Sequence, residues 1–347
     1  MPAEHVERHP ELTVVLPVRN EGEHIERILA DLCDQDIAPE LVEFLVVDGR
    51  SDDDTRERVT RLAAADPRIR LLDNPRRLAG AARNIGAAAA AAPYILFVDG
   101  HCRVPSRHML SAVLEAFRAG AVCVSRPQPL DWPDATPFQQ AVSLARSSWL
   151  GHDARSRIYD SGYSTCSPLS AGCGYTRELY FAVGGVDESF DACEDLEFNA
   201  RLAARGITAV HHPDFTVIYA PRSRWRTLLR QLYRYGYGRA RLWRRRPSLR
   251  MGLAPLLSLF LLLLAVLPVA AVWWPPAGHL WLLMVAVYGA AAAATAVVQA
   301  VTAGRPGLWW RILACLPAIH LGAGLGFLSG LLGGPPWSHH ADGHHGR

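Results

Sequence analysis

The sequence predicts an α/β fold: a mainly parallel sheet flanked by helices, followed by a basic helix and about three membrane-spanning helices. Two observations predict the sheet. Short runs of aliphatic and β-branched residues alternate with stretches of helical periodicity, and the connections between them are short. A third observation predicts the spans, because the C-terminal part holds three long apolar runs with almost no charge.

Strands and helices are expected to alternate from residue 12 to residue 98. The predicted strands are residues 12–18, 42–47, 69–72 and 94–98. The predicted helices are residues 23–32, 53–65 and 80–92. This alternation favours a parallel sheet, but by itself it says nothing about function.

Three apolar runs follow, at residues 251–274, 279–303 and 312–334. Each reaches the ~20 residues that a helix needs to cross a bilayer core. Buried core helices are the alternative, and three uncharged runs in succession argue against them. The third run is rich in glycine, which leaves a re-entrant segment open. We expect a globular domain over residues 1–221, a basic interfacial helix over 222–250, a transmembrane region over 251–334 and a His-rich tail over 335–347.

Charge is divided unevenly along the chain. Up to Asp214 there are 22 Arg and 32 acidic residues, a net charge of −10; the rest has 14 Arg and one acidic residue, a net charge of +13. Eleven of those Arg lie within residues 222–250, and none lies within residues 274–278. Positive loops stay on the cytosolic side, so we expect a multi-pass protein of the cytoplasmic membrane with a cytosolic globular domain. If all three runs cross, the tail lies outside.

The basic segment interleaves arginine with aromatic residues and leucine. A helix of this composition lies in the membrane interface and attracts anionic lipid headgroups. Nucleic acid is the rival partner of an arginine-rich stretch. Direct attachment to an apolar run favours membrane lipids as partners and no nucleic acid.

Polar side chains follow the predicted strands, where ligands bind in open α/β sheets. These clusters are residues 19–21, 48–51 and 99–101, with a later pair at 194–195 that opens a helix. No GxGxxG or GxxxxGK[ST] loop occurs, which excludes a dinucleotide-binding Rossmann loop and a P-loop. A divalent cation held by Asp99 would then neutralise a bound diphosphate.

Six motifs occur in the order typical of one family. They are residues 17–21 (PVRNE), 47–55 (VDGRSDDDT), 82–86 (ARNIG), 99–101 (DGH), 184–188 with 194–197 (GGVDE and EDLE), and 231–235 (QLYRY). The order resembles the family 2 glycosyltransferases with a GT-A fold, over about two thirds of the chain. It looks closest to the glucosyltransferases of succinoglycan-type exopolysaccharide synthesis.

Three of the motifs depart from the family pattern. Arg50 and Asp54 stand where the family has glycine, and Tyr235 stands where it has tryptophan. The metal motif is Asp-Gly-His, and histidine is a better ligand for Mn²⁺ than for Mg²⁺. The predicted cofactor is therefore Mn²⁺, with Mg²⁺ as the alternative.

The resemblance assigns a nucleotide-sugar site at the strand ends. The predicted donor-binding residues are Pro17, Asn20, Glu21, Asp48, Ser51, Arg83, Asn84 and Asp99. The predicted metal ligands are Asp99 and His101. The predicted contacts with acceptor or diphosphate are Gln231, Arg234 and Tyr235. Simpler roles stay open: helix caps for Asn20, Glu21 and Asp48, a solvated helix face for Arg83 and Asn84, and lipid headgroups for Arg234.

Asp195 is the predicted general base, which takes the proton of the acceptor hydroxyl as that oxygen attacks the anomeric carbon. Glu194 is the substitute, and its charge is expected to raise the pKa of Asp195. The alternative is that both residues only stabilise the N-terminus of a helix.

The resemblance implies a membrane-anchored inverting glycosyltransferase. It would move a sugar from a UDP-sugar to a lipid-linked saccharide acceptor in cell-surface or exopolysaccharide synthesis. Three alternatives stay open: a polyprenyl-phosphate sugar synthase, a processive polysaccharide synthase, and a non-catalytic nucleotide-binding membrane scaffold.

Overall fold

The computed structural model describes residues 9–152, 156–160, 162–247 and 252–334. The chain forms two compact units. The first unit consists of Met1–Leu130 and Ser156–Ala220, and the second of Asp131–Arg155 and Pro221–Arg347. The division at Ala220 lies next to the boundary expected at residue 221, but residues 131–155 group with the C-terminal part. The His-rich tail lies outside the described residues.

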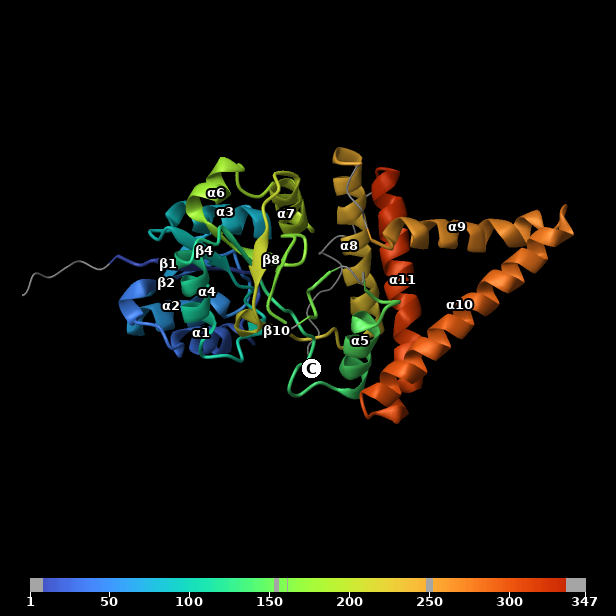
Figure 1. Ribbon diagram of the computed structural model, residues 1–347, viewed down its shortest axis with the longest axis horizontal. Helices are drawn as coiled ribbons and strands as arrows, with labels where there is room; N and C mark the ends of the chain where they lie inside the picture. Colours follow the sequence, from blue (N-terminus) through green and yellow to red (C-terminus); the bar gives the residue numbers. More distant parts are fainter. Residues whose placement is uncertain (1–8, 153–155, 161, 248–251, 335–347) are drawn as a thin grey trace, which may run out of the picture. The chain divides into compact units, whose positions relative to one another are not determined.

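The first unit is built on one large sheet, in which Figure 1 labels β1, β2, β4 and β8. Its strand order is β3-β2-β1-β4-β8-β6-β9-β7. Its parallel half consists of β1 (Leu12–Val18), β2 (Val42–Asp48), β3 (Ile69–Asp73) and β4 (Tyr94–Phe97). Val18 pairs with Asp48, so the ends of β1 and β2 meet at one edge of the sheet. This edge carries the polar clusters identified in the sequence.

The other half of the sheet is mixed. β8 pairs antiparallel with both β4 and β6, β6 is parallel to β9, and β7 is antiparallel to β9. These strands are β6 (Cys123–Ser125), β7 (Ser164–Cys166), β8 (Gly172–Thr176) and β9 (Ala209–His211). A second small sheet joins β5 (Cys102–Arg103) to β10 (Ile218–Tyr219), which brings Tyr219 beside the loop that follows β4.

Helices cover both faces of the sheet (Figure 1). The helices α1, α2 and α4 cover one face, where they form a core with Leu12, Val14 and Leu16 of β1. The helices α3, α6 and α7 cover the other face, where the core contains Val15 of the same strand. Alternate residues of a strand point to opposite faces, so one strand supplies both cores. The helices are α1 (Ile25–Cys33), α2 (Thr55–Ala65), α3 (Ala79–Ala89), α4 (Met109–Arg118), α6 (Arg177–Ala182) and α7 (Glu194–Ala204), with short helices η1 (Pro39–Leu41) and η2 (Pro213–Phe215).

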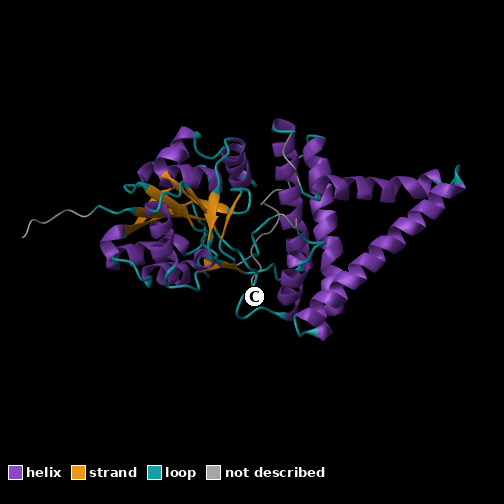
Figure 2. Cartoon of the chain, viewed as in Figure 1, coloured by secondary structure: helices purple, strands orange, loops and turns teal. Residues whose placement is uncertain are grey.

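In the described part of the second unit every element is helical (Figure 2). The elements are α5 (Pro137–Ser147), α8 (Trp225–Arg245), α9 (Ala254–Ala270), α10 (Pro275–Thr302), η3 (Pro306–Leu308) and α11 (Trp309–Leu331). Two stretches, Pro275–Thr302 and Pro306–Leu331, are long and apolar enough to cross a membrane. The first expected span corresponds to α9, an apolar helix of 17 residues that is shorter than these two.

Candidate functional site

The loops that follow β1 and β2 are bonded to each other at the edge of the sheet. The Gly49 amide donates to the Val18 carbonyl at 2.8 Å. The Asn20 amide donates to Ser51 Oγ at 2.9 Å, and the Asp52 amide donates to Asn20 Oδ1 at 2.8 Å. Asn20 adopts a left-handed backbone conformation, with φ 58°, which turns its side chain back toward the second loop. Asn20 and Ser51, both predicted to bind the nucleotide-sugar donor, therefore lie together.

Asp48 ends β2, and its side chain is fully buried. Its carboxylate accepts from the Ser51 hydroxyl at 2.6 Å, from the Ser51 amide at 3.2 Å and from Arg56 Nη1 at 3.2 Å. A buried carboxylate held by three donors shapes the loop around it. These bonds order the loop that follows β2 and do not cap α2, which begins at Thr55 with Asp54 as its N-cap residue. Contact of Asp48 with the sugar donor stays a prediction, and the exposed polar groups beside it belong to Asn20, Arg50 and Asp52. Pro17 lies within β1, half-buried.

Asp99 follows β4 at the centre of a charged network. Arg83 Nη2 donates to Asp99 Oδ1 at 3.3 Å, and the Tyr219 hydroxyl donates to Asp99 Oδ2. Arg126 Nη2 lies 3.8 Å from the same oxygen and donates to the Tyr219 hydroxyl at 3.0 Å. Burial raises the pKa of Asp99, but the charges of Arg83 and Arg126 outweigh it and hold the pKa at about 2. The carboxylate is therefore charged at neutral pH.

Arg126 and Tyr219 are functional candidates that the sequence analysis did not identify. Arg126 is 4 % exposed and comes directly after the three-residue strand β6, where it also donates to the Phe97 carbonyl at 2.5 Å. A charged residue at a strand end is the signal used for Asp48 and Asp99, so it could have been found in the same way. Tyr219 carries no such signal, because only the pairing of β10 with β5 places it at Asp99.

His101 lies beside Glu21. His101 Nδ1 is 3.0 Å from Glu21 Oε1, and the imidazole and Tyr219 rings form a T-shaped pair with a centroid distance of 5.6 Å. Within the described ranges, no group of three or more His, Cys, Asp or Glu side chains is placed to hold a metal ion. Metal binding by Asp99 and His101 therefore stays a prediction. Two side chains could hold a cation only if it took its remaining ligands from substrate phosphates and water.

Arg83 joins the two ends of the predicted active site. Its guanidinium donates to Asp99 with one nitrogen and to Glu194 with the other, and its side chain is only 12 % exposed. Burial raises the pKa of Glu194; the Arg83 charge opposes this shift and the Asp195 charge adds to it. The neighbouring Asp195 is exposed at the start of α7. Of the predicted carboxylates, Asp195 therefore faces solvent and Glu194 is held by Arg83.

Asn84 has a structural role beside the predicted one. Its Nδ2 donates to the Val186 carbonyl at 3.0 Å and to Glu188 at 2.8 Å. Its Oδ1 accepts from the Tyr180 hydroxyl at 2.7 Å and from the Val186 amide at 3.1 Å. An asparagine amide has two donors and two acceptor sites, and all are filled by protein. Asn84 therefore fixes the segment before α7, and its contact with the sugar donor stays a prediction.

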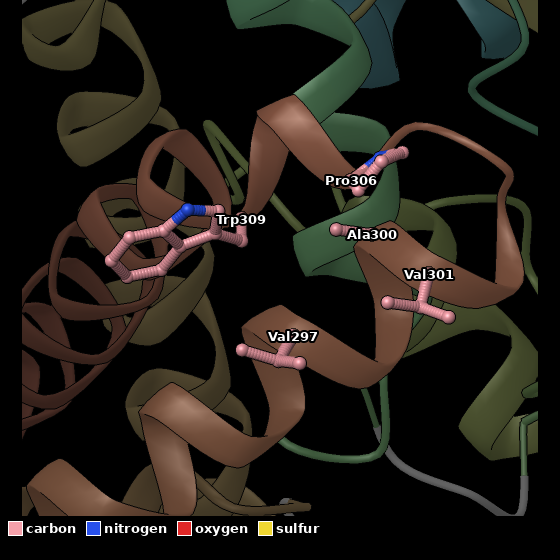
Figure 3. A pocket seen from close by; sticks show the side chains of 5 residues that line it. All are labelled: Val297, Ala300, Val301, Pro306 and Trp309. Atoms are coloured by element: carbon pink, nitrogen blue, oxygen red, sulfur yellow. The ribbon is translucent and has the colours of Figure 1, made fainter.

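The three residues of the last motif lie on α8 in the second unit. Gln231 Nε2 donates to the Tyr235 hydroxyl at 3.3 Å, and the Arg146 guanidinium lies over the Tyr235 ring at 6.0 Å. Contact of Gln231, Arg234 and Tyr235 with acceptor or diphosphate stays a prediction. The second unit also has an apolar recess, which offers no charged side chain to a nucleotide; its lining is Val297, Ala300, Val301, Pro306 and Trp309 (Figure 3).

Comparison with known proteins agrees with this architecture. The family model described as Glycosyl transferase family 2 matches residues 13–179. The succinoglycan biosynthesis protein ExoA of Rhizobium meliloti is 32 % identical over 262 residues, 74 % of this chain and 76 % of that protein. A dolichyl N-acetyl-α-D-glucosaminyl phosphate 3-β-D-2,3-diacetamido-2,3-dideoxy-β-D-glucuronosyltransferase of Methanococcus voltae is 24 % identical, over 73 % of this chain and 80 % of that one.

A solved structure has the same fold. It is the mannosyltransferase PcManGT from Pyrobaculum calidifontis, in complex with GDP-Man and Mn²⁺. The TM-score is 0.55 at 21 % identity, with 91 % of this chain and 87 % of that chain covered. The chain therefore belongs to the family 2 glycosyltransferases with a GT-A fold, and it is a glycosyltransferase of polysaccharide or glycan synthesis.

Proposed function

We propose that the protein is a membrane-anchored, inverting, metal-dependent glycosyltransferase that moves a sugar from a UDP-sugar to a lipid-linked saccharide. One observation carries the proposal: Arg83 links Asp99, at the donor end of the site, to Glu194, next to the expected base. A transferase must hold the leaving diphosphate and activate the acceptor at the same time. The Arg83 bridge ties Asp99, which is suited to the first task, to the start of α7, where Asp195 is suited to the second.

The donor side consists of Asp99, His101 and the groups around them. Asp99 and His101 would hold Mn²⁺, or Mg²⁺, and the bound ion would stabilise the negative charge of the departing diphosphate. Arg83 and Arg126 keep Asp99 charged, as a metal ligand must be. The exposed Asn20 would contact the nucleoside. The Mn²⁺ and GDP-Man of the structural neighbour support a cation with a nucleotide-sugar.

The acceptor side is Asp195. Its exposed carboxylate would take the proton of the attacking hydroxyl, whereas Glu194 is held by Arg83. The attack goes directly from the acceptor oxygen to the anomeric carbon, and no enzyme nucleophile is required. A single displacement of this kind inverts the configuration at that carbon, so an α-linked donor would give a β-linked product.

A lipid-linked acceptor is supported by two observations. The second unit exposes apolar helices next to the basic helix α8, as expected of a protein held at a membrane surface. The Methanococcus relative is named for a dolichyl phosphate-linked sugar, and the Rhizobium relative for succinoglycan biosynthesis. Gln231, Arg234 and Tyr235 on α8 would contact the acceptor or the diphosphate.

The experiment is a donor screen in membranes that contain the protein. UDP-, GDP- and dTDP-sugars are supplied with a lipid extract, and nucleotide release is measured with and without EDTA. We expect release from a UDP-sugar that depends on a divalent cation, with Mn²⁺ preferred. Full activity after EDTA treatment would contradict metal dependence, and a product cleaved by mild acid without a disaccharide would indicate a polyprenyl-phosphate sugar synthase.

Asp195→Asn tests the base. The amide has the size of the carboxylate but takes no proton at neutral pH, so turnover should fall by about 10² to 10⁴ while donor binding stays nearly unchanged. Asp36→Asn is the matched control, because Asp36 lies beyond the C-terminal end of α1 and pairs with Arg107. Near-normal turnover of Asp195→Asn would move the base to another residue.

A further inference from the structure

We propose that only α9 and α10 cross the bilayer, and that α11 lies with α8 in the membrane interface on the side of the catalytic unit. This replaces the expectation of three spans. The proposal rests on the membrane location in the proposed function, but it does not depend on the transfer chemistry. Its evidence lies entirely within the second unit.

The first observation is that α8 and α11 are in contact at their backbones. A Cβ added at Gly322 would lie 2.6 Å from the Leu229 carbonyl oxygen, and one added at Gly330 would lie 2.8 Å from that of Tyr237. At Gly326, midway between them, it would overlap the carbonyl oxygen of Tyr233. Residues four apart on one helix thus meet residues four apart on the other, in the same chain direction, so the helices run parallel.

This contact extends along the whole of α8. Near its start, Trp225 Nε1 donates to the Ala314 carbonyl at 3.2 Å. Near its end, Gly330 approaches Ala240, with an added Cβ 2.7 Å from the Ala240 methyl. Figure 1 shows the two helices side by side. Any depth in the membrane that α11 reaches is therefore reached by α8 as well.

The second observation is the charge of α8. The helix contains seven arginines among its 21 residues. If α11 crossed the membrane, Arg230, Arg234 and Arg239 would be carried to the middle of the hydrocarbon layer. Arginines at that depth strongly oppose insertion. In the interface the same arginines meet anionic lipid headgroups.

The third observation is what surrounds α11. Within Pro306–Leu331, 61 % of the residues of an apolar 18-residue stretch are buried inside the protein. The corresponding share for α10 is 17 %. Its His320 lies 2.9 Å from the Tyr288 hydroxyl and 3.0 Å from the Leu150 carbonyl oxygen. The length and apolar composition of α11 are thus explained by protein neighbours, as in a core helix. Lipid is not needed to cover it.

α9 and α10 have the opposite character, because they expose apolar side chains and carry no charged residue. Leu256 of α9 is 64 % exposed and Leu283 of α10 is 60 % exposed. At about 1.5 Å per residue, the 28 residues of α10 extend for about 42 Å, the thickness of a bilayer with its headgroup regions. The 17 residues of α9 reach the lower limit for a span.

Tryptophan marks both ends of this hairpin. Trp273 and Trp274, at the turn between α9 and α10, are 79 % and 58 % exposed. Trp309 and Trp310, after the other end of α10, are 45 % and 51 % exposed and are followed by Arg311. Tryptophan is enriched at both membrane–water interfaces, and arginine at the cytosolic one. Two crossings therefore place Arg311 and the arginines of α8 on one side, and the Trp273–Trp274 turn on the other.

Two tagged versions of the full chain test this topology in bacterial membranes. One carries a short epitope between Trp274 and Pro275, and the other carries the same epitope after Arg347. An impermeant antibody is added to intact spheroplasts and, separately, to permeabilised ones. We expect the epitope at the turn to be accessible in intact spheroplasts, and the C-terminal epitope to be accessible only after permeabilisation.

Access to the C-terminal epitope in intact spheroplasts would show that α11 crosses, and would overturn the proposal. Protection of the epitope at the turn would also overturn it, because the hairpin would then not cross. If the insertion prevents folding, Trp274→Cys labelled with an impermeant maleimide, against the unmodified chain as background, gives the same readout. Nucleotide release by the same membranes reports the transfer reaction separately, so a failure of the proposed function is distinguishable.

Discussion

At the scale of single residues, the site depends on side chains that hold Asp99 charged and in place. Tyr219 and Arg126 come from β10 and from the end of β6, far from Asp99 in the sequence. The Tyr219 hydroxyl donates to Asp99 and accepts from Arg126. It therefore orients the carboxylate that the proposed cation would bind, without touching the reacting atoms itself.

Tyr219→Phe removes only this hydroxyl. A hydrogen bond to a charged group contributes about 1.5–3 kcal/mol, so we expect transfer to fall about 10- to 100-fold, with more Mn²⁺ needed for the half-maximal rate. Nucleotide release as a function of Mn²⁺ concentration is the measurement. Tyr163→Phe is the control, because Tyr163 is 70 % exposed. An equal response of the two variants would argue against the orienting role.

The acid stability of the protein should report the environment of Asp99. Its pKa is held at about 2, below the ordinary 3.8, so the charged carboxylate stabilises the fold above about pH 4. That contribution is lost as the pH falls toward 2. Asp99→Asn should lower the free energy of unfolding by about 2 kcal/mol near neutral pH. Denaturant unfolding in detergent should show this difference closing between about pH 4 and pH 2; a constant difference would refute the assignment.

The sequence identified part of this site, and the reason is physical. Asp99 and Glu194 follow recognisable signals, a polar strand end and an acidic helix start, and the structure joins them through Arg83. Asn84 matched a motif, but its hydrogen-bonding groups are filled by distant backbone and side chains. Tyr219 could not be found, since its role arises from the pairing of two strands of two residues each.

At the scale of elements, the parallel half of the sheet was predicted and the mixed half was not. β1, β2 and β4 are apolar runs buried between helices, and β3 is a partly buried strand at the end of the sheet. The structure confirms these four strands and the helices between them. β5 to β10 have two to five residues each and are too short for a hydrophobic pattern. The predicted helix over residues 80–92 ends at Ala89, before the strand that begins at Tyr94.

The glycines of α11 give a prediction at this scale. Gly326→Ala would force the Ala methyl against the Tyr233 carbonyl of α8, and overpacking of this kind usually costs about 1–3 kcal/mol. Gly289→Ala is the matched control, because an added Cβ at Gly289 of α10 meets nothing within 4 Å. Thermal unfolding of the two variants in the same detergent should show a lower melting temperature for Gly326→Ala alone. Equal melting temperatures would mean that α8 and α11 are not packed at their backbones.

At the scale of the whole molecule, the proposed topology gives the chain two modes of membrane attachment. The arginines of α8 would bind by charge, which salt screens, and the exposed leucines of α9 and α10 would bind by the hydrophobic effect, which salt does not weaken. We expect the protein to stay in the membrane pellet after washes with concentrated salt and with alkaline carbonate, and to be released by detergent. Release by salt alone would show that attachment is electrostatic.

The Arg83 bridge has a consequence for how the site can change over time. Replacing Asp99 leaves the buried Arg83 guanidinium paired with Glu194, and replacing Glu194 leaves it paired with Asp99. Each substitution alters the setting of the other, so their effects on stability should differ from a simple sum by about 0.5–3 kcal/mol. In a lineage that has lost one carboxylate, the cost of losing the second therefore differs from its cost in the original protein. Arg83, Asp99 and Glu194 should be inherited, or lost, as a set.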